Sequence, residues 1–122
     1  MALAQVVVQD ADVLLLDEPT SALDLRHQLE LLGLVRDRCR ARGGIALAAL
    51  HDLNLAARFA DRVAVVHEGL VVALGTAEAV LTEALLAEVY GVEAATGRDP
   101  LGHATVTPMR PLAPRRRHAT TA

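Results

Sequence analysis

Two adjacent carboxylates, Asp17 and Glu18, stand directly after an unbroken apolar run at residues 13–16. The run is short, rich in leucine and closed by Pro19, which predicts a strand buried on both faces of a parallel sheet rather than a helix. In open α/β sheets, ligands bind just beyond the carboxyl ends of such strands. The acid pair is therefore expected where a ligand would bind. In isolation, Asp17 would cap a turn and Glu18 would meet solvent.

A second apolar run, at residues 45–50, ends on His51. A helical pattern lies between the two runs, so the order predicts a strand, a crossover helix and a parallel strand, with the carboxyl ends of both strands at one edge of the sheet. If the strands are close neighbours, His51 falls near Asp17 and Glu18. A histidine after a strand is more often a turn residue or a satisfied hydrogen-bond donor, but the shared edge favours a functional position here.

Residues 13–24 resemble the Walker B motif and D-loop of an ABC-transporter ATPase, because the strand, the acid pair, the proline and a Ser-Ala-Leu-Asp turn occur in order. The resemblance implies that Asp17 binds Mg²⁺, mostly through water, and that Glu18 polarises the water that attacks the γ-phosphate of ATP. Mg²⁺ suits this assignment, since it keeps several waters and needs few carboxylates. The resemblance also places the D-loop at the nucleotide site and the interface with a second subunit. Its residues are Ser21, Ala22, Leu23 and Asp24.

Residues 51–63 resemble the H-loop, or switch region, of the same ATPases. Their sequence is most similar to that of the importers of iron-siderophore complexes, haem and cobalamin. By this resemblance, His51 contacts the γ-phosphate and the attacking water and reports whether the γ-phosphate is present. An imidazole suits that task, since it can donate to phosphate and titrates near the working pH. Asp52 would cap the helix that follows.

Every one of the 12 Lys+Arg residues is an arginine. A P-loop needs Gly-x-x-x-x-Gly-Lys followed by Ser or Thr, because its backbone amides and its lysine hold the phosphates. The sequence therefore carries no Walker A motif, and the Leu-Ser-Gly-Gly-Gln signature of the resembled family is also absent. We expect the C-terminal part of a nucleotide-binding domain, without ATPase activity by itself.

Length and composition fit a single domain, since 52% of the 122 residues are hydrophobic and can fill a modest core. We expect a cytoplasmic protein without direct membrane insertion, because no apolar run spans a bilayer and no signal-peptide pattern is present. The net charge of −3, and an arginine run at 36–42 without aromatic partners, argue against nucleic-acid binding. The single cysteine, Cys39, is expected to be a packed helix thiol, although the neighbouring arginines favour a lower pKa.

The expected fold class is α/β: a partial P-loop NTPase core with parallel strands and crossover helices, followed by a β-hairpin and short C-terminal helices. The ABC-type domain is expected over residues 1–96. Residues 1–9 open with a helix-like pattern, although three valines argue locally against helix. Asp24 is the expected N-cap of a helix that ends at Gly43. The remaining expected elements are a hairpin of strands at 63–66 and 70–74, helices at 77–81 and 83–90 capped by Thr76 and Thr82, and a disordered Pro/Arg-rich tail at 97–122.

If the resemblance holds, the parent protein hydrolyses ATP with Mg²⁺ in a head-to-tail dimer of ATPase subunits, bound to permease subunits at the inner face of the plasma membrane. The chain would be part of the ATP-hydrolysing subunit of an importer for iron-siderophore, haem or cobalamin-type metal chelates. An alternative from another class is a non-catalytic interaction module that pairs with intact ABC ATPase subunits. A Mg²⁺-phosphatase that uses Asp17 and Glu18 is a third hypothesis, but further metal ligands are lacking.

Overall fold

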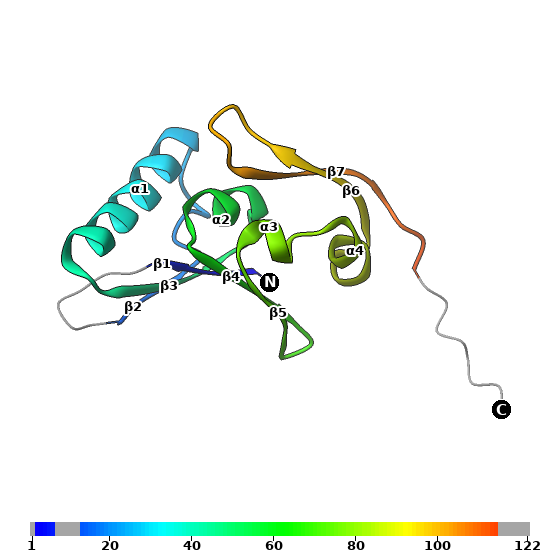
Figure 1. Cartoon of the computed structure of the whole chain (residues 1–122), viewed down its shortest axis with the longest axis horizontal. Coiled ribbons are helices and arrows are strands. Elements are labelled where there is room, and N and C mark those ends of the chain that lie inside the picture. Colours follow the sequence, from blue (N-terminus) through cyan, green and yellow to red (C-terminus); the bar gives the residue numbers. More distant parts are fainter. Residues whose placement is uncertain (1, 7–12, 115–122) are drawn as a thin grey trace.

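The computed structural model describes residues 2–6 and 13–114, with side chains from residue 13 onward. A five-stranded sheet has the strand order β2-β3-β1-β4-β5, and a separate two-stranded sheet pairs β6 with β7. The helices lie on one face of the large sheet, and the small sheet lies beyond them (Figure 1). The strands are β1 (Ala2–Val6), β2 (Val13–Asp17), β3 (Ile45–Leu50), β4 (Arg62–His67), β5 (Leu70–Gly75), β6 (Val92–Arg98) and β7 (Ala104–Pro111). The helical elements are α1 (Leu25–Arg42), α2 (Leu53–Phe59), α3 (Ala77–Val80), α4 (Glu83–Leu85) and the π-helical turn η1 (Leu86–Tyr90).

Strands β2 and β3 are parallel neighbours joined by α1, as the sequence predicted. Their register aligns Asp17 with Ala49. The Glu18 N–H donates to the Ala49 carbonyl at 2.9 Å, which continues the ladder one residue past β2. The unit therefore brings the carboxyl ends of two parallel strands to one edge of the sheet, where α/β proteins bind ligands.

The first described residues form a strand, so the expected helix-like opening is wrong for this part of the chain. β1 lies in the middle of the sheet, antiparallel to both β3 and β4. In this position its backbone N–H and C=O groups find partners on both sides, and that pairing overrides the helix propensity of its alanines and leucine. The three valines at 6–8 argued against a helix, and the strand at Val6 agrees with this. Val7 and Val8 lie outside the described residues.

Helix α1 begins and ends where the sequence predicted. The Asp24 carboxylate accepts a hydrogen bond from the His27 N–H at 2.9 Å and caps the N-terminus. Gly43 has a φ of 70°, in the left-handed region, and its N–H donates to the Cys39 carbonyl at 2.8 Å. Such a glycine ends a helix at little cost, because it has no Cβ to clash.

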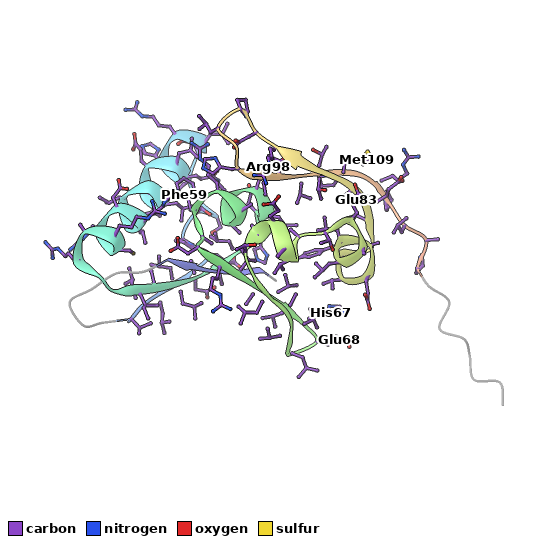
Figure 2. The ribbon with its side chains drawn as sticks, in the orientation of Figure 1. Phe59, His67, Glu68, Glu83, Arg98 and Met109 are labelled. Atoms are coloured by element: carbon purple, nitrogen blue, oxygen red, sulfur yellow. The ribbon has the colours of Figure 1, made fainter. Side chains whose placement is uncertain are left out.

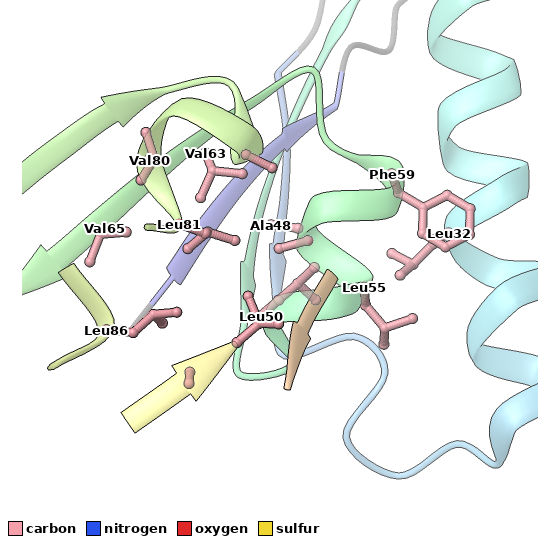
Figure 3. Packing of buried hydrophobic residues seen from close by; sticks show 14 residues of the cluster. Leu32, Ala48, Leu50, Leu55, Phe59, Val63, Val65, Val80, Leu81 and Leu86 are labelled. Carbon is pink, nitrogen blue, oxygen red and sulfur yellow. The ribbon is translucent and has the colours of Figure 1, made fainter. Parts of the chain in front are cut away.

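The core lies between the large sheet and the elements on its covered face (Figure 3). Alternate residues of β3 and β4 point into it, namely Ala46, Ala48, Leu50, Val63 and Val65. The facing elements supply the other large side chains, which include Leu32, Phe59, Val80, Leu86 and Val106. Burial of each large aliphatic side chain stabilises the fold by roughly 1.5–3 kcal/mol, so this face of the sheet anchors the strand ends that carry the polar residues.

The opposite face of the large sheet is not covered by any element of the described chain (Figures 1 and 2). Leu15 of β2 is 70% exposed, and Val13, Ile45, Val71 and Leu74 are exposed as well. β2 is also an edge strand, and the expectation that it is buried on both faces is wrong, because no described element covers the face that carries Leu15. In the described chain, the sheet therefore has an unpaired apolar edge at β2.

The segment after the second parallel strand follows the prediction closely. β4 and β5 form the expected hairpin. Thr76 and Thr82 cap α3 and α4, since their hydroxyl oxygens accept hydrogen bonds from N–H groups three residues further on. The helix expected at 83–90 is α4 followed by η1, and it ends at Gly91 with a φ of 66°.

Residues 92–111 form a second hairpin, so the disorder expected from residue 97 onward is wrong over this part; residues 115–122 lie outside the described residues. Ala94 and Val106 anchor the hairpin, because both side chains are buried in the core. The prolines do not prevent pairing. Pro100 lies in the turn, and Pro108 lies on an edge strand beside a shift in register, where a missing N–H costs little.

Candidate functional site

Glu18 and His51 are in contact at the carboxyl ends of β2 and β3, as the shared-edge argument predicted. The His51 Nε2 atom lies within hydrogen-bond distance of the Glu18 Oε1 atom. Solvent reaches both groups, since the side chains are 66% and 39% exposed for His51 and Glu18 respectively. A carboxylate beside an imidazole can take a proton from a bound water, while the imidazole orients the carboxylate or donates to an anionic ligand.

The turn after β2 sets the direction of the Glu18 side chain. Glu18 has a φ of 48°, in the left-handed region, where a non-glycine residue is uncommon. Its carbonyl accepts hydrogen bonds from the Ser21 N–H at 3.2 Å and the Ser21 Oγ at 3.1 Å. Because its N–H is bonded to β3, Glu18 is fixed on both sides of its Cα atom. Ser21 thus has a visible part in holding the turn.

Residues 21–24, the predicted D-loop, connect this turn to α1 and are largely exposed. Asp24 caps the helix, and its Oδ1 atom also lies 2.8 Å from the His27 Nδ1 atom. Gln28 was not singled out from the sequence, yet its amide donates to the carbonyls of Thr20 at 3.3 Å and Leu23 at 3.1 Å. Its position one turn after an N-cap is the signal that could have found it, because a long amide there reaches back to the preceding loop.

Asp17 ends β2 on the uncovered side of the sheet. Its side chain is exposed and lines a shallow cavity of about 200 Å³ over β2 and β3. Among the described residues, no hydrogen-bond or ion-pair partner occupies its carboxylate, so both oxygens are available. Such a carboxylate fits Mg²⁺, which takes one or two protein carboxylates and keeps its other waters. Within the described ranges, no three His, Cys, Asp or Glu side chains gather into a metal cage.

His51 is held between a buried residue and a capped helix. Leu50 lies in the core, and the Asp52 carboxylate caps α2 as predicted, with contacts of 2.9 and 3.1 Å to N–H groups in its first turn. Asn54 had no predicted role, but its side chain makes two hydrogen bonds to the Val106 backbone on β7. The residue type was the available signal, because asparagine disfavours helix interiors unless its amide has a partner.

The other reactive groups have structural or exposed positions. Cys39 is buried, and burial raises the pKa of its thiol, so it is the packed thiol that was expected. His67 stands at the exposed end of the β4–β5 hairpin (Figure 2). In the arginine run, Arg40 pairs with Asp61 at 3.6 Å. The part of the chain that the structure describes contains no helix long and apolar enough to cross a bilayer.

The curated proteins that this chain matches include ATP-binding proteins of hemin import and of achromobactin transport. The chain is 52% identical over 96 residues to the hemin import ATP-binding protein HmuV of Rhodopseudomonas palustris strain BisB5, a match that covers 79% of this chain and 36% of the relative. It is 53% identical over 90 residues to HmuV of Streptomyces coelicolor, covering 74% and 32%. It is 43% identical over 101 residues to the achromobactin transport ATP-binding protein CbrD of Dickeya dadantii, covering 83% and 38%.

No protein-family model matches the sequence. A search of solved structures finds an ABC transporter of the metal-chelate type in an inward-facing conformation, with a TM-score of 0.67 and 22% identity, covering 80% of this chain and 40% of that one. That likeness shows the fold, which is the one found in an ABC ATPase domain. The chain spans about a third of the length of the curated relatives it matches.

Proposed function

We propose that this chain supplies the residues that hydrolyse ATP in the ATP-binding subunit of an ABC importer. It is homologous, over about a third of their length, to ATP-binding proteins of import systems. The contact between Glu18 and His51 at the ends of two parallel strands carries this proposal. Glu18 acts as the general base, His51 binds the γ-phosphate and the attacking water, and Asp17 holds Mg²⁺. The loop at 21–24 faces a second ATPase subunit.

The chemistry starts from the contact between Glu18 and His51. The Glu18 carboxylate, whose backbone is held by the turn beneath it, accepts a proton from the water as the water oxygen bonds to the γ-phosphorus of ATP. The bond from that phosphorus to the bridging oxygen breaks, and ADP leaves. His51 exchanges its contact with Glu18 for one with a γ-phosphate oxygen, and thereby registers that the phosphate is present. When bound, Mg²⁺ offsets the negative charge of the phosphates. Phosphoryl transfer depends mainly on such positioning and charge neutralisation.

In this proposal, the loop that cradles the phosphates is supplied from outside these 122 residues. The sequence has no lysine and no Gly-x-x-x-x-Gly-Lys pattern, so it cannot grip a nucleotide in the usual way. The open apolar sheet face and the unpaired edge of β2 offer a surface for the remaining two-thirds of an ABC import ATP-binding protein. The chain by itself is then inactive towards ATP.

The importer would carry haem or a siderophore and would bind its permease subunits at the inner face of the plasma membrane. Names of relatives at about half identity support this class of cargo, since they read hemin import and achromobactin transport. A strain that lacks HmuV and receives the fusion described below should recover growth when hemin is the iron source, and no recovery would count against a haem importer.

A fusion tests the residue roles. The sequence of Streptomyces coelicolor HmuV that precedes the match is joined to the whole 122-residue chain, and ATP hydrolysis is measured. Glu18→Gln keeps the shape of the side chain but removes the base, so turnover should fall roughly 10²–10⁴-fold while ATP still binds. His51→Ala should also leave binding intact and remove most hydrolysis.

The β4–β5 turn offers matched controls, since His67 and Glu68 form a second histidine–glutamate pair at 3.9 Å that has no part in the proposed chemistry. Glu68→Gln and His67→Ala should hydrolyse ATP at the unmodified rate. Normal turnover by Glu18→Gln or His51→Ala would remove the proposed role of that residue. If the fusion is inactive but the free chain lowers the ATPase activity of intact HmuV on mixing, the interaction module is the better description.

A further inference from the structure

The side chain of Asn54 clamps helix α2 to the C-terminal hairpin. Its Nδ2 atom donates to the Val106 carbonyl at 3.1 Å, and the Val106 N–H donates to its Oδ1 atom at 2.7 Å. One amide thus satisfies both backbone groups of a residue on β7, as a neighbouring strand would. The two partners are 52 residues apart in the sequence, so the clamp joins the middle of the chain to its last described strand.

The clamp lies close to His51. Asn54 is in the first turn of α2, and its own N–H donates to Asp52, the cap residue that directly follows His51, at 2.9 Å. Val106 is 5% exposed and belongs to the same core cluster as Leu50, which directly precedes His51. The hairpin therefore holds the short segment around His51 from both ends, through the core and through the clamp.

A seven-residue helix cannot hold such a position unaided. Short isolated helices are marginal, and α2 owes its place to packing and to its partners. The hairpin packs on α2 as well as on the core (Figure 1). Loss of the clamp would leave Asp52 as a cap but would free the first turn of α2 to shift, and His51 would shift with it.

We propose that Asn54, through Val106 and the β6–β7 hairpin, is a positioning residue that keeps the His51 imidazole against Glu18. For its effect on ATP hydrolysis, this inference rests on the function proposed above. It assigns the hairpin a part in the reaction, although the hairpin carries none of the residues that touch the phosphates. Asn54 itself is a positioning residue and does not contact the reacting atoms.

The first test uses the full chain and needs no nucleotide. The imidazole ¹⁵N signals of the histidines are recorded by NMR, the His51 signal is assigned with His51→Ala, and Glu18→Ala provides the reference for a lost contact. Asn54→Ala should move the His51 Nε2 signal towards that reference and leave His27 and His67 unchanged. Arg98→Ala is the matched control, because it breaks the bond of the same hairpin to Glu78 and a bond to the Gly102 carbonyl within the hairpin turn, whereas neither of these two side-chain bonds reaches α2 or β7.

Asn54→Asp keeps the test decisive if Asn54→Ala does not fold. The aspartate retains the acceptor for the Val106 N–H but loses the donor, so it should move the His51 signal part of the way. An unmoved His51 signal in a folded Asn54 variant overturns the proposal, and so does an equal movement in Arg98→Ala.

The second test measures hydrolysis by the fusion. Asn54→Ala should lower kcat on the order of tenfold to a hundredfold and leave KM for ATP nearly unchanged, because a small misplacement of a catalytic group slows chemistry more than binding. If Glu18→Gln and His51→Ala abolish turnover but Asn54→Ala does not alter kcat, the positioning role fails and the proposed function stands. If Glu18→Gln and His51→Ala turn over normally, the proposed function fails, and the NMR result still decides the clamp.

Discussion

Glu18, whose side chain contacts His51, has a strained backbone conformation. A left-handed conformation costs a non-glycine residue roughly 1–2 kcal/mol, and such costs collect at functional sites, where the surrounding structure enforces them. Here the enforcement is visible in the hydrogen bonds from the Glu18 N–H to Ala49 and from Ser21 to the Glu18 carbonyl. Glycine would adopt the same turn without strain, so the glutamate is better explained by its carboxylate than by the fold.

The Asp99 carboxylate makes the stability of the fold depend on pH. The N–H of His103 donates to its carboxylate at 2.9 Å and that of Leu101 at 2.8 Å, and these bonds lower the pKa of Asp99 below its ordinary value of 3.8. Because the folded-state pKa is the lower one, the stabilisation by Asp99 is complete above about pH 3.8 and is lost as the pH falls through the folded value.

In an NMR titration, the amide signals of Leu101 and His103 should therefore shift with a midpoint below pH 3.8. Asp99→Asn should abolish that transition, since the amide keeps an acceptor oxygen but does not titrate in this range. A midpoint at or above the ordinary pKa of an aspartate would contradict the assignment.

At the scale of elements, the β4–β5 turn has a backbone conformation at Glu68 that suits asparagine or aspartate better than glutamate. Glu68 and Gly69 have φ values of 51° and 77°, and they form the two-residue loop between His67 and Leu70. Loops with two positive φ values favour asparagine or aspartate followed by glycine. Glu68→Asn should therefore raise the free energy of unfolding by about 0.5–1 kcal/mol, measured by urea denaturation.

The same exchange at Glu83 is the control. Glu83 lies in the first turn of α4, where the backbone is right-handed, so asparagine brings no conformational gain there. An equal gain at both positions would mean that the effect arises from the charge rather than from the turn.

Elements with a local signature could be predicted from the sequence. Asp24, Thr76 and Thr82 mark helix starts, because their side chains cap the first turn. Gly43 marks a helix end, because glycine adopts a positive φ easily. These helix boundaries could therefore be predicted from short stretches of sequence. The shared edge of β2 and β3 also followed from local order, and with it the meeting of Glu18 and His51.

Elements defined by distant partners could not be predicted in the same way. β1 is a strand because β3 and β4 flank it, and the β6–β7 hairpin is ordered because Ala94 and Val106 reach the core. Neither partner is visible in a short stretch of sequence. Asn54 was missed for the same reason, because its partner is on β7.

At the scale of the whole molecule, the large sheet has one face that is covered and one face that is open to solvent. The helices and the small hairpin cover one side of the large sheet, while the side with Leu15 and Ile45 meets solvent. A continuous apolar face of this kind is usually covered by a partner surface. The molecule as described is therefore expected to associate with itself when nothing else covers that face.

Leu15→Glu tests this expectation. In sedimentation velocity, the average mass of the unmodified chain should rise with concentration, and Leu15→Glu should weaken the rise, because a charge on the face resists burial. Leu101→Glu is the matched control, since Leu101 is 69% exposed, as Leu15 is 70% exposed, but lies on the β6–β7 turn. An equal effect of both substitutions would show that general charge, and not this face, governs association.

The central place of β1 affects how the chain is made. Ala2 pairs with Leu50 on one side and with Val65 on the other, so β1 leaves the ribosome long before either neighbour exists. Pairing between such distant positions closes large loops, which slows folding. Until β3 and β4 have been synthesised, the nascent β1 segment lacks the partners that it has in the folded chain. Insertion of this strand, rather than formation of the local β4–β5 hairpin, is then the step that sets the pace of folding.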